Sequence, residues 1–273
     1  MMNLLMAESM RLWSRRMTRF FPAILAVLMV AGVVIAYLVI SNDTDNSPDF
    51  VIDMAGGADA GSVLGPVSSL LPIMAFVIGA SYIGADVKTG VLEQILTWEP
   101  RRLRVLAARL LAAGSGVAVL AMALGAFLVG LLFALAVTTG TVDGTTGELW
   151  GNIGLAIVRL GLASALFCAF GLGVTVLVNN SVGSIVGFVI YWFIIENFLV
   201  AAFLPKVAVY LPITNASAFA NGTDVERIDG SVFSDDFELV AEHSYLVAGL
   251  LLAAWTAVAV IGAGIVFQRR DIA

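Results

Sequence analysis

Long apolar runs alternate with shorter polar segments along the whole chain. Runs of about 20 apolar residues are long enough to cross a bilayer as α-helices. The pattern therefore predicts an all-α, polytopic membrane protein whose residues 1–273 form a single transmembrane domain. We expect Pro22 to open the first span, because proline is tolerated in the first turn of a helix. The six predicted transmembrane helices are 21–40, 67–85, 105–138, 152–178, 183–204 and 245–268.

The segment before the first run, residues 4–20, has the spacing of an amphipathic helix. Met6, Met10 and Trp13 recur at helical intervals, whereas Arg11 lies on another face. A helix of this kind lies in the headgroup layer with its apolar face toward the acyl chains. We therefore predict an interfacial helix over 4–20, the alternative being a frayed basic tail.

A second amphipathic stretch lies between the second and third runs, at residues 86–102. Leu92, Ile95 and Leu96 share one helical face, and Pro100 ends the stretch. A short helix held beside a membrane bundle offers a surface to a cytoplasmic partner; packing on its own bundle is the alternative. The candidate partner contacts are Lys88, Leu92, Glu93, Ile95, Leu96 and Trp98.

Composition and charge orient this bundle in the membrane. The chain of 273 residues is 60% hydrophobic, with a mean hydropathy of +0.99 and a net charge of −6, whereas a soluble domain has about 45–50% apolar residues. With the N-terminus in the cytoplasm, most of the 14 Lys and Arg residues lie inside and most of the 20 acidic residues lie outside. This bias predicts a multi-pass protein of the cell membrane, by our expectation a bacterial inner membrane, with both termini cytoplasmic. Because the negative charge comes from outer loops, nucleic-acid binding is not expected.

The sequence lacks the common motifs of an enzyme. The single His243 excludes an HExxH zinc motif, and there is neither a GxSxG elbow nor a GxxxxGK[ST] phosphate loop. We therefore expect this chain to be no enzyme, with no metal site, no cofactor and no nucleotide site of its own. If ATP drives the protein, ATP and Mg²⁺ belong to a partner chain.

Two charged residues lie inside predicted spans, Arg159 in 152–178 and Glu196 in 183–204. Charge within a bilayer needs a partner or water. At about 1.5 Å per residue, both lie roughly 10–12 Å from the same outer face, on consecutive antiparallel helices. We therefore predict an intramembrane ion pair between Arg159 and Glu196. The pair either fixes the packing of the two helices or forms a substrate or proton site, as in an ion-gradient-driven secondary transporter.

The longest connection between runs is the predicted extracytoplasmic loop 205–243. Residues 205–220 are mainly apolar and suit a short helix against the outer leaflet, whereas 221–243 are polar and acidic. A lid over an exit pathway and an ordinary solvated loop are both open interpretations. In the fifth run, Gly183 and Gly187 form a GxxxG spacing that suits either a contact between two chains or packing within one bundle.

The stretch at 86–102 also carries a pattern of residues in a fixed order. An acidic residue, a glycine and a Leu-Glu pair precede a Pro-Arg pair: Asp86, Gly90, Leu92-Glu93 and Pro100-Arg101. Glu8 with Arg11 and Arg15 precedes this pattern, and the Phe-Gln-Arg-Arg-Asp-Ile sequence at 267–272 follows it. With these motifs and its order of spans, the chain resembles an ABC-2 type permease, the membrane subunit of one class of ABC exporters.

The resemblance implies that two such chains pair, as a homodimer or a heterodimer, above two cytoplasmic ABC ATPase subunits. Residues 88–99 would be the coupling helix seated in an ATPase cleft, with Lys88 and Glu93 as polar contacts beside its apolar face. Closure of the ATPases would change access to a pathway between the permeases. The cargo class implied is a lipid, a peptide or a hydrophobic small molecule, and membrane lipids are further expected partners.

Overall fold

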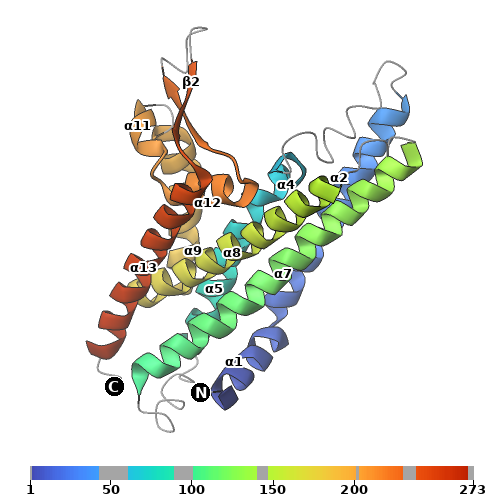
Figure 1. The fold of residues 1–273 in the computed structure, drawn as a ribbon. Helices are drawn as coiled ribbons and strands as arrows, with labels where there is room; N and C mark the ends of the chain where they lie inside the picture. The colour runs from blue at the N-terminus through green and yellow to red at the C-terminus, as the bar shows by residue number, and fades with distance from the viewer. Residues whose placement is uncertain are drawn as a thin grey trace.

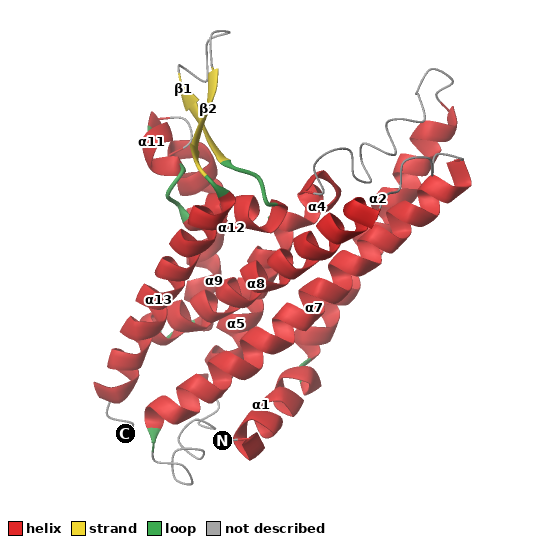
Figure 2. Ribbon diagram, in the orientation of Figure 1, coloured by secondary structure: helices red, strands yellow, loops and turns green. Residues whose placement is uncertain are grey.

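The computed structural model describes residues 2–42, 61–88, 101–139, 147–200, 203–229 and 238–269. Within these ranges the chain forms a helical bundle with a small β-hairpin at one end (Figure 1, Figure 2). The helices are α1 (Met2–Ser14), α2 (Arg16–Asn42), α4 (Gly61–Ser68), α5 (Leu70–Lys88), α7 (Arg102–Thr139), α8 (Gly147–Val178), α9 (Ser181–Ile190), the π-helix η1 (Tyr191–Val200), α11 (Pro205–Ala208), α12 (Pro212–Asn221) and α13 (Tyr245–Arg269). The strands are β1 (Val225–Asp229) and β2 (Glu238–His243).

Four helices of the described chain are long and apolar enough to cross a membrane. They are Arg16–Ile35, Arg102–Thr138, Gly147–Val178 and Tyr245–Arg269. Two shorter apolar helices accompany them, Leu70–Ala85 and Ser181–Glu196. An α-helix satisfies its backbone N–H and C=O groups by hydrogen bonds within itself, so apolar helices of this length suit a lipid environment. The chain is therefore a helical protein of the kind that crosses a membrane several times.

The core of the bundle lies around α8. This helix packs against α5, α7 and α13, and its inward side chains, Phe167 among them, are fully buried. Gly79 of α5 lies against the backbone of Cys168, and Gly171 of α8 lies against the backbone of Phe76; neither position has room for a Cβ atom. Small residues thus allow the α5 and α8 backbones to touch, as is typical of membrane helices.

The first two helices differ from the sequence-based boundaries. The chain breaks at Arg15, so the predicted interfacial segment 4–20 is divided between α1 and the beginning of α2. Pro22 lies inside α2 and does not open a helix, so that prediction is wrong. Because proline lacks an N–H, α2 lacks one backbone hydrogen bond at this position.

The second and fifth predicted runs are each divided as well. A turn at Ser69 separates α4 from α5, and Pro72 lies in the first turn of α5, where no backbone donor is needed. Asn180 caps α9 by accepting hydrogen bonds from Val182 and Gly183. From Tyr191 the helix continues as η1, which changes the direction of its side chains.

The described residues of the region at 205–243 form regular secondary structure. It contains α11, α12 and the antiparallel β1–β2 hairpin, in which Arg227 pairs with Val240 across the strands. Arg227 also forms an ion pair with Glu242, with 3.1 Å between Nε and Oε2. α12 packs on α8, α13 and α4. Figure 1 shows the hairpin at the end of the bundle opposite to α1 and the chain termini.

Candidate functional site

A buried charged cluster joins three helices at the end of the bundle where α1 lies. Glu8 of α1 and Arg109 of α7 are 3% and 0% exposed, and the distance from Arg109 Nε to Glu8 Oε1 is 3.4 Å. The Tyr82 hydroxyl of α5 donates to the Glu8 carboxylate and also contacts the Glu8 carbonyl oxygen at 3.1 Å. Buried charges need partners, and α1, α5 and α7 each contribute one side chain to this cluster.

Two further arginines surround this cluster. Arg15 donates from Nη1 to the Ser81 carbonyl oxygen at 3.1 Å, and its guanidinium lies 4.6 Å from the centre of the Tyr82 ring. Arg11 lies 3.9 Å from the Glu8 carboxylate. α1 is therefore fastened to the C-terminal end of α5 and to the N-terminal part of α7 by both hydrogen bonds and ion pairs.

Two of the three helices in this cluster flank, along the chain, the segment that the sequence singled out. α5 ends at Lys88 and α7 begins at Arg102, so α1 is held against the two helices that flank residues 89–101. Arg102 also donates from Nη1 to the Phe267 and Gln268 carbonyl oxygens near the end of α13, at 3.4 Å each. Of the candidate contacts, Lys88 belongs to α5 by its backbone, while its side chain lies outside the described structure. The others lie outside the described residues: Leu92, Glu93, Ile95, Leu96 and Trp98.

The sequence held a signal for this cluster that our prediction did not use. Glu8 precedes Leu12 by one helical turn, and Leu12 is buried against Gly116 of α7. Residues at i and i+4 share a helix face, so an inward-facing Leu12 places Glu8 inward too. An inward carboxylate on α1 requires a buried base, and Arg109 supplies it.

Arg159 and Glu196 do not form the predicted ion pair in the described structure. The Glu196 carboxylate accepts hydrogen bonds from the Thr214 backbone N–H at 2.7 Å and from its hydroxyl at 3.1 Å. Arg159 donates from Nε to the Leu155 carbonyl oxygen at 3.4 Å, and its guanidinium lies 5.1 Å from the centre of the Tyr245 ring. The prediction assumed two uninterrupted neighbouring helices with matching depths, and the structure corrects it.

The physical reason is the position of α12. Glu196 reaches the first turn of α12 through Thr214, whereas the Arg159 guanidinium lies directly against Gly222, the residue that ends this helix. A helix of 10 residues separates its two ends by about 15 Å. Leu211, at the N-cap, provides no side-chain hydrogen bond, so Glu196 satisfies an N–H that the helix itself leaves without a partner.

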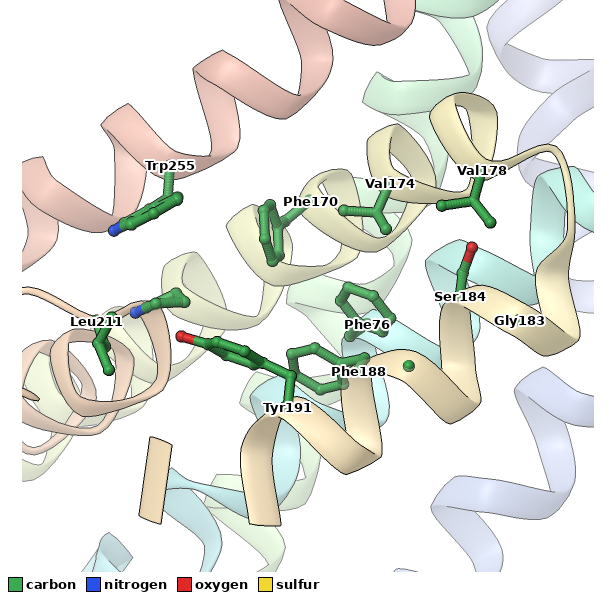
Figure 3. A pocket seen from close by; sticks show the side chains of 12 residues that line it. Phe76, Phe170, Val174, Val178, Gly183, Ser184, Phe188, Tyr191, Leu211 and Trp255 are labelled. Atoms are coloured by element: carbon green, nitrogen blue, oxygen red, sulfur yellow. The ribbon is translucent and has the colours of Figure 1, made fainter. Parts of the chain in front are cut away.

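A cavity of about 320 Å³ lies between α5, α8, α9 and α13. Figure 3 shows its aromatic wall, in which the Phe76 and Phe188 rings stack with 3.8 Å between centres and Phe170 meets Phe76 edge-on. Gly187 of α9 faces open space and contributes no side chain. At the other end the Trp255 indole donates to the Tyr210 carbonyl oxygen at 3.0 Å. The cavity can therefore hold an apolar group of modest size.

A metal site is not found in the part of the chain that the structure describes. No group of three or more His, Cys, Asp and Glu residues lies close enough together there to hold an ion. His243 instead shares a hydrogen bond of 3.0 Å with the Asn215 side chain and stacks on Tyr210. These contacts tie the end of the hairpin to α12.

Comparison with known proteins gives one family. A family described as "Protein of unknown function (DUF2705)" matches residues 23–273. No curated protein matches the chain.

Proposed function

We propose, for a chain that belongs to the DUF2705 family of unknown function, that it is the permease subunit of an ATP-driven ABC export system. Two permease chains, identical or different, would work with two cytoplasmic ATPase subunits that bind ATP and Mg²⁺. The cargo would be a lipid, a peptide or a hydrophobic small molecule. The observation that carries this proposal is the buried cluster of Glu8, Tyr82 and Arg109, because it fastens α1 to both helices that flank segment 86–102.

The proposed topology has six spans, formed by α2, α4 with α5, α7, α8, α9 with η1, and α13. Both termini are cytoplasmic, and the membrane is a bacterial inner membrane. The positive-inside bias of the sequence supports this orientation, as does the position of α1 and the end of α13 at the same end of the bundle (Figure 1). Met10 on α1 is 72% exposed, which supports an interfacial position for this helix.

In the proposed mechanism, the segment 86–102 receives the movement of the ATPases. The apolar face of Leu92, Ile95 and Leu96 would contact the ATPase cleft, with Lys88, Glu93 and Trp98 around it. Since a buried ion pair joins α1 to α7 and hydrogen bonds join α1 to α5, a push on this segment moves the three helices together. ATP then shifts the bundle between two states through contacts that differ between them.

A co-purification experiment tests the proposal. The chain is tagged in its own cells, isolated in mild detergent and assayed for a bound ATPase subunit and for ATP hydrolysis. We expect Leu92→Asp combined with Ile95→Asp to abolish both. The matched control is Leu204→Asp with Val207→Asp, which places the same change at the same spacing on exposed side chains. An untouched ATPase signal in the first double variant, or no ATPase with the wild-type chain, would falsify the proposal.

The ion-gradient alternative relied on Arg159 and Glu196 acting as a pair. In the described structure these side chains have separate partners at opposite ends of α12. The described structure therefore gives no support to an ion-gradient-driven transporter that uses Arg159 and Glu196 as a pair.

A further inference from the structure

The elbow between α1 and α2 has an excess of positive charge. Residues 9–42 contain four arginines and no Asp, Glu, Lys or His. Glu8, the acid that precedes them, is buried and pairs with Arg109 of α7. Among the described residues neither Arg16 nor Arg19 forms an ion pair, and both side chains are exposed. The surface of the elbow is therefore cationic and calls for an anion.

Backbone contacts hold this charge in place. Arg19 donates from Nε to the Trp13 carbonyl oxygen at 2.9 Å, which brings its guanidinium back across the elbow. Arg15, at the break between the helices, is held on α5 through the Ser81 carbonyl oxygen. Arg16 and Arg19 are three residues apart on α2, so they are neighbours on one helix face. Two guanidinium groups placed in this way can both donate to the oxygens of one phosphate.

The same arginines lie at the edge of a helix that is able to cross a membrane. This apolar helix begins at Arg16, so the first turn of α2 lies where the hydrocarbon core meets the headgroups. Trp13 and Met17, on either side of Arg16, are exposed, and tryptophan is enriched at this level of a bilayer. The positive charge therefore lies at the depth of the lipid phosphates.

An exposed apolar stripe continues from the arginines along α2. Phe20, Val27 and Val30 follow Arg16 at helical intervals, which keeps them on its side of the helix. Phe20 and Val27 are 64% and 66% exposed. At about 1.5 Å per residue, the distance from Phe20 to Val30 is about 15 Å, or half of a hydrocarbon core of about 30 Å. This face has a cationic end and the apolar length of one leaflet, so it is complementary to an anionic phospholipid.

We propose that the α1–α2 elbow binds an anionic phospholipid, with the phosphate between Arg16 and Arg19 and an acyl chain along Phe20, Val27 and Val30. A second copy of the chain paired through α2 would bring two sets of arginines together, because both copies cross the membrane in the same direction, and like charges repel. Lipid binding needs neither an ATPase nor a cargo. The inference therefore does not rest on the proposed export function, and the two can fail separately.

The test compares two lipids that have the same acyl chains and differ in headgroup charge. The full chain in nonionic maltoside detergent is titrated with dioleoyl phosphatidylglycerol and with dioleoyl phosphatidylcholine, and native mass spectrometry measures the bound lipid. We expect phosphatidylglycerol to bind more tightly by about tenfold or more, because choline places a positive charge beside the phosphate that the two arginines contact. Equal affinity of the two lipids for the wild-type chain would overturn the proposal.

Variants without the charge locate the site. Arg16→Gln combined with Arg19→Gln should reduce the preference to about threefold or less. The matched control is Arg101→Gln with Arg269→Gln, which removes two exposed arginines from the same end of the bundle (Figure 1) and should keep the preference. An equal loss in both double variants means diffuse attraction to the whole end and contradicts a site at the elbow. If loss of the Arg19 hydrogen bond to Trp13 unfolds the first variant, Arg16→Glu alone decides, and an unchanged preference in it rejects the site.

A competitor and the oligomeric state identify the occupant. Glycerol 3-phosphate carries the phosphate without acyl chains, so an equal concentration should leave the bound phosphatidylglycerol in place. Displacement by this compound would assign the arginines to a free phosphate and contradict the role of the apolar stripe. In the same spectra, a dimer of the chain that excludes phosphatidylglycerol would assign this face to a second copy, against the proposal.

Discussion

Glu196 and Arg159 lie at opposite ends of α12, with the carboxylate at its first turn and the guanidinium against Gly222. A helix carries partial positive charge at its N-terminus and partial negative charge at its C-terminus. Both side chains therefore match the end that they face. α12 is a short helix that packs on α8 and α13, and two charges from neighbouring elements stabilise it from either side.

Removal of the carboxylate should loosen the first turn of α12. Glu196→Ala deletes the acceptor of two Thr214 hydrogen bonds, and the loss of such a cap costs about 1–2 kcal/mol. Unfolding of the detergent-solubilised chain, followed by helical circular dichroism, measures the change. Glu226→Ala, on an exposed strand position, is the control and should stay within about 0.5 kcal/mol of wild type.

Gly222 is a position where any side chain is strained. Its φ is +72°, and an added Cβ would overlap the Arg159 guanidinium. Gly222→Ala should destabilise the protein by about 1–3 kcal/mol, measured by the same unfolding assay. Arg159→Ala combined with Gly222→Ala removes the overlap. This double variant should recover only the part of the lost stability that is not due to backbone strain at residue 222. Gly32→Ala, where nothing lies within 4 Å of the new Cβ, should be neutral or stabilising.

The order of the helices was predictable because apolar length is a strong signal. Each predicted run coincides with a helix or with two consecutive helices of the described structure, and α8 and α13 begin and end within a few residues of 152–178 and 245–268. The interruptions were not predictable in this way. The turn at Ser69, the break at Arg15 and the transition to η1 lie inside apolar or amphipathic sequence, where hydropathy gives no boundary signal.

The charged partners were harder to predict than the helices. The pairing of Arg159 with Glu196 was inferred from depth alone, and depth does not reveal an element that inserts between two helices. Polar residues at 221–243 suggested a loop, yet β1 and β2 pair as an antiparallel hairpin, and Arg227 and Glu242 form an ion pair across it. Whether segment 86–102 contacts a partner stays a prediction.

The Glu8 cluster should be a main source of stability at the α1 end of the bundle. Glu8→Ala removes an anionic partner from the fully buried Arg109, and the loss of one member of a buried pair costs about 3–5 kcal/mol. Unfolding measured as above should show this loss, whereas Glu148→Ala, on an exposed helix end, should cost less than about 1 kcal/mol. Arg109→Met added to Glu8→Ala should recover part of the loss, since it removes the charge left behind.

The contact between α5 and α8 depends on Gly79. A Cβ at this position would lie within 3.2 Å of the Cys168 backbone, and the helices must separate to accommodate it. Gly79→Ala should therefore cost about 1–3 kcal/mol in the unfolding assay. Gly130→Ala in α7 is the matched control, because nothing lies within 4 Å of its Cβ. Equal stability of the two variants would contradict the close approach of α5 and α8.

The proposed orientation can be tested by cysteine labelling in intact cells. Cys168 is the only cysteine and is buried, so the wild-type chain should not react with a membrane-impermeant maleimide. Thr223→Cys introduces a thiol at an exposed position before the hairpin, and Ser14→Cys introduces one at the exposed end of α1. We expect the first to label in intact cells and the second only after permeabilisation, since the two positions lie at opposite ends of the bundle and the positive-inside bias puts α1 in the cytoplasm. Labelling of Ser14→Cys from outside would invert the topology and place segment 86–102 out of reach of any cytoplasmic ATPase.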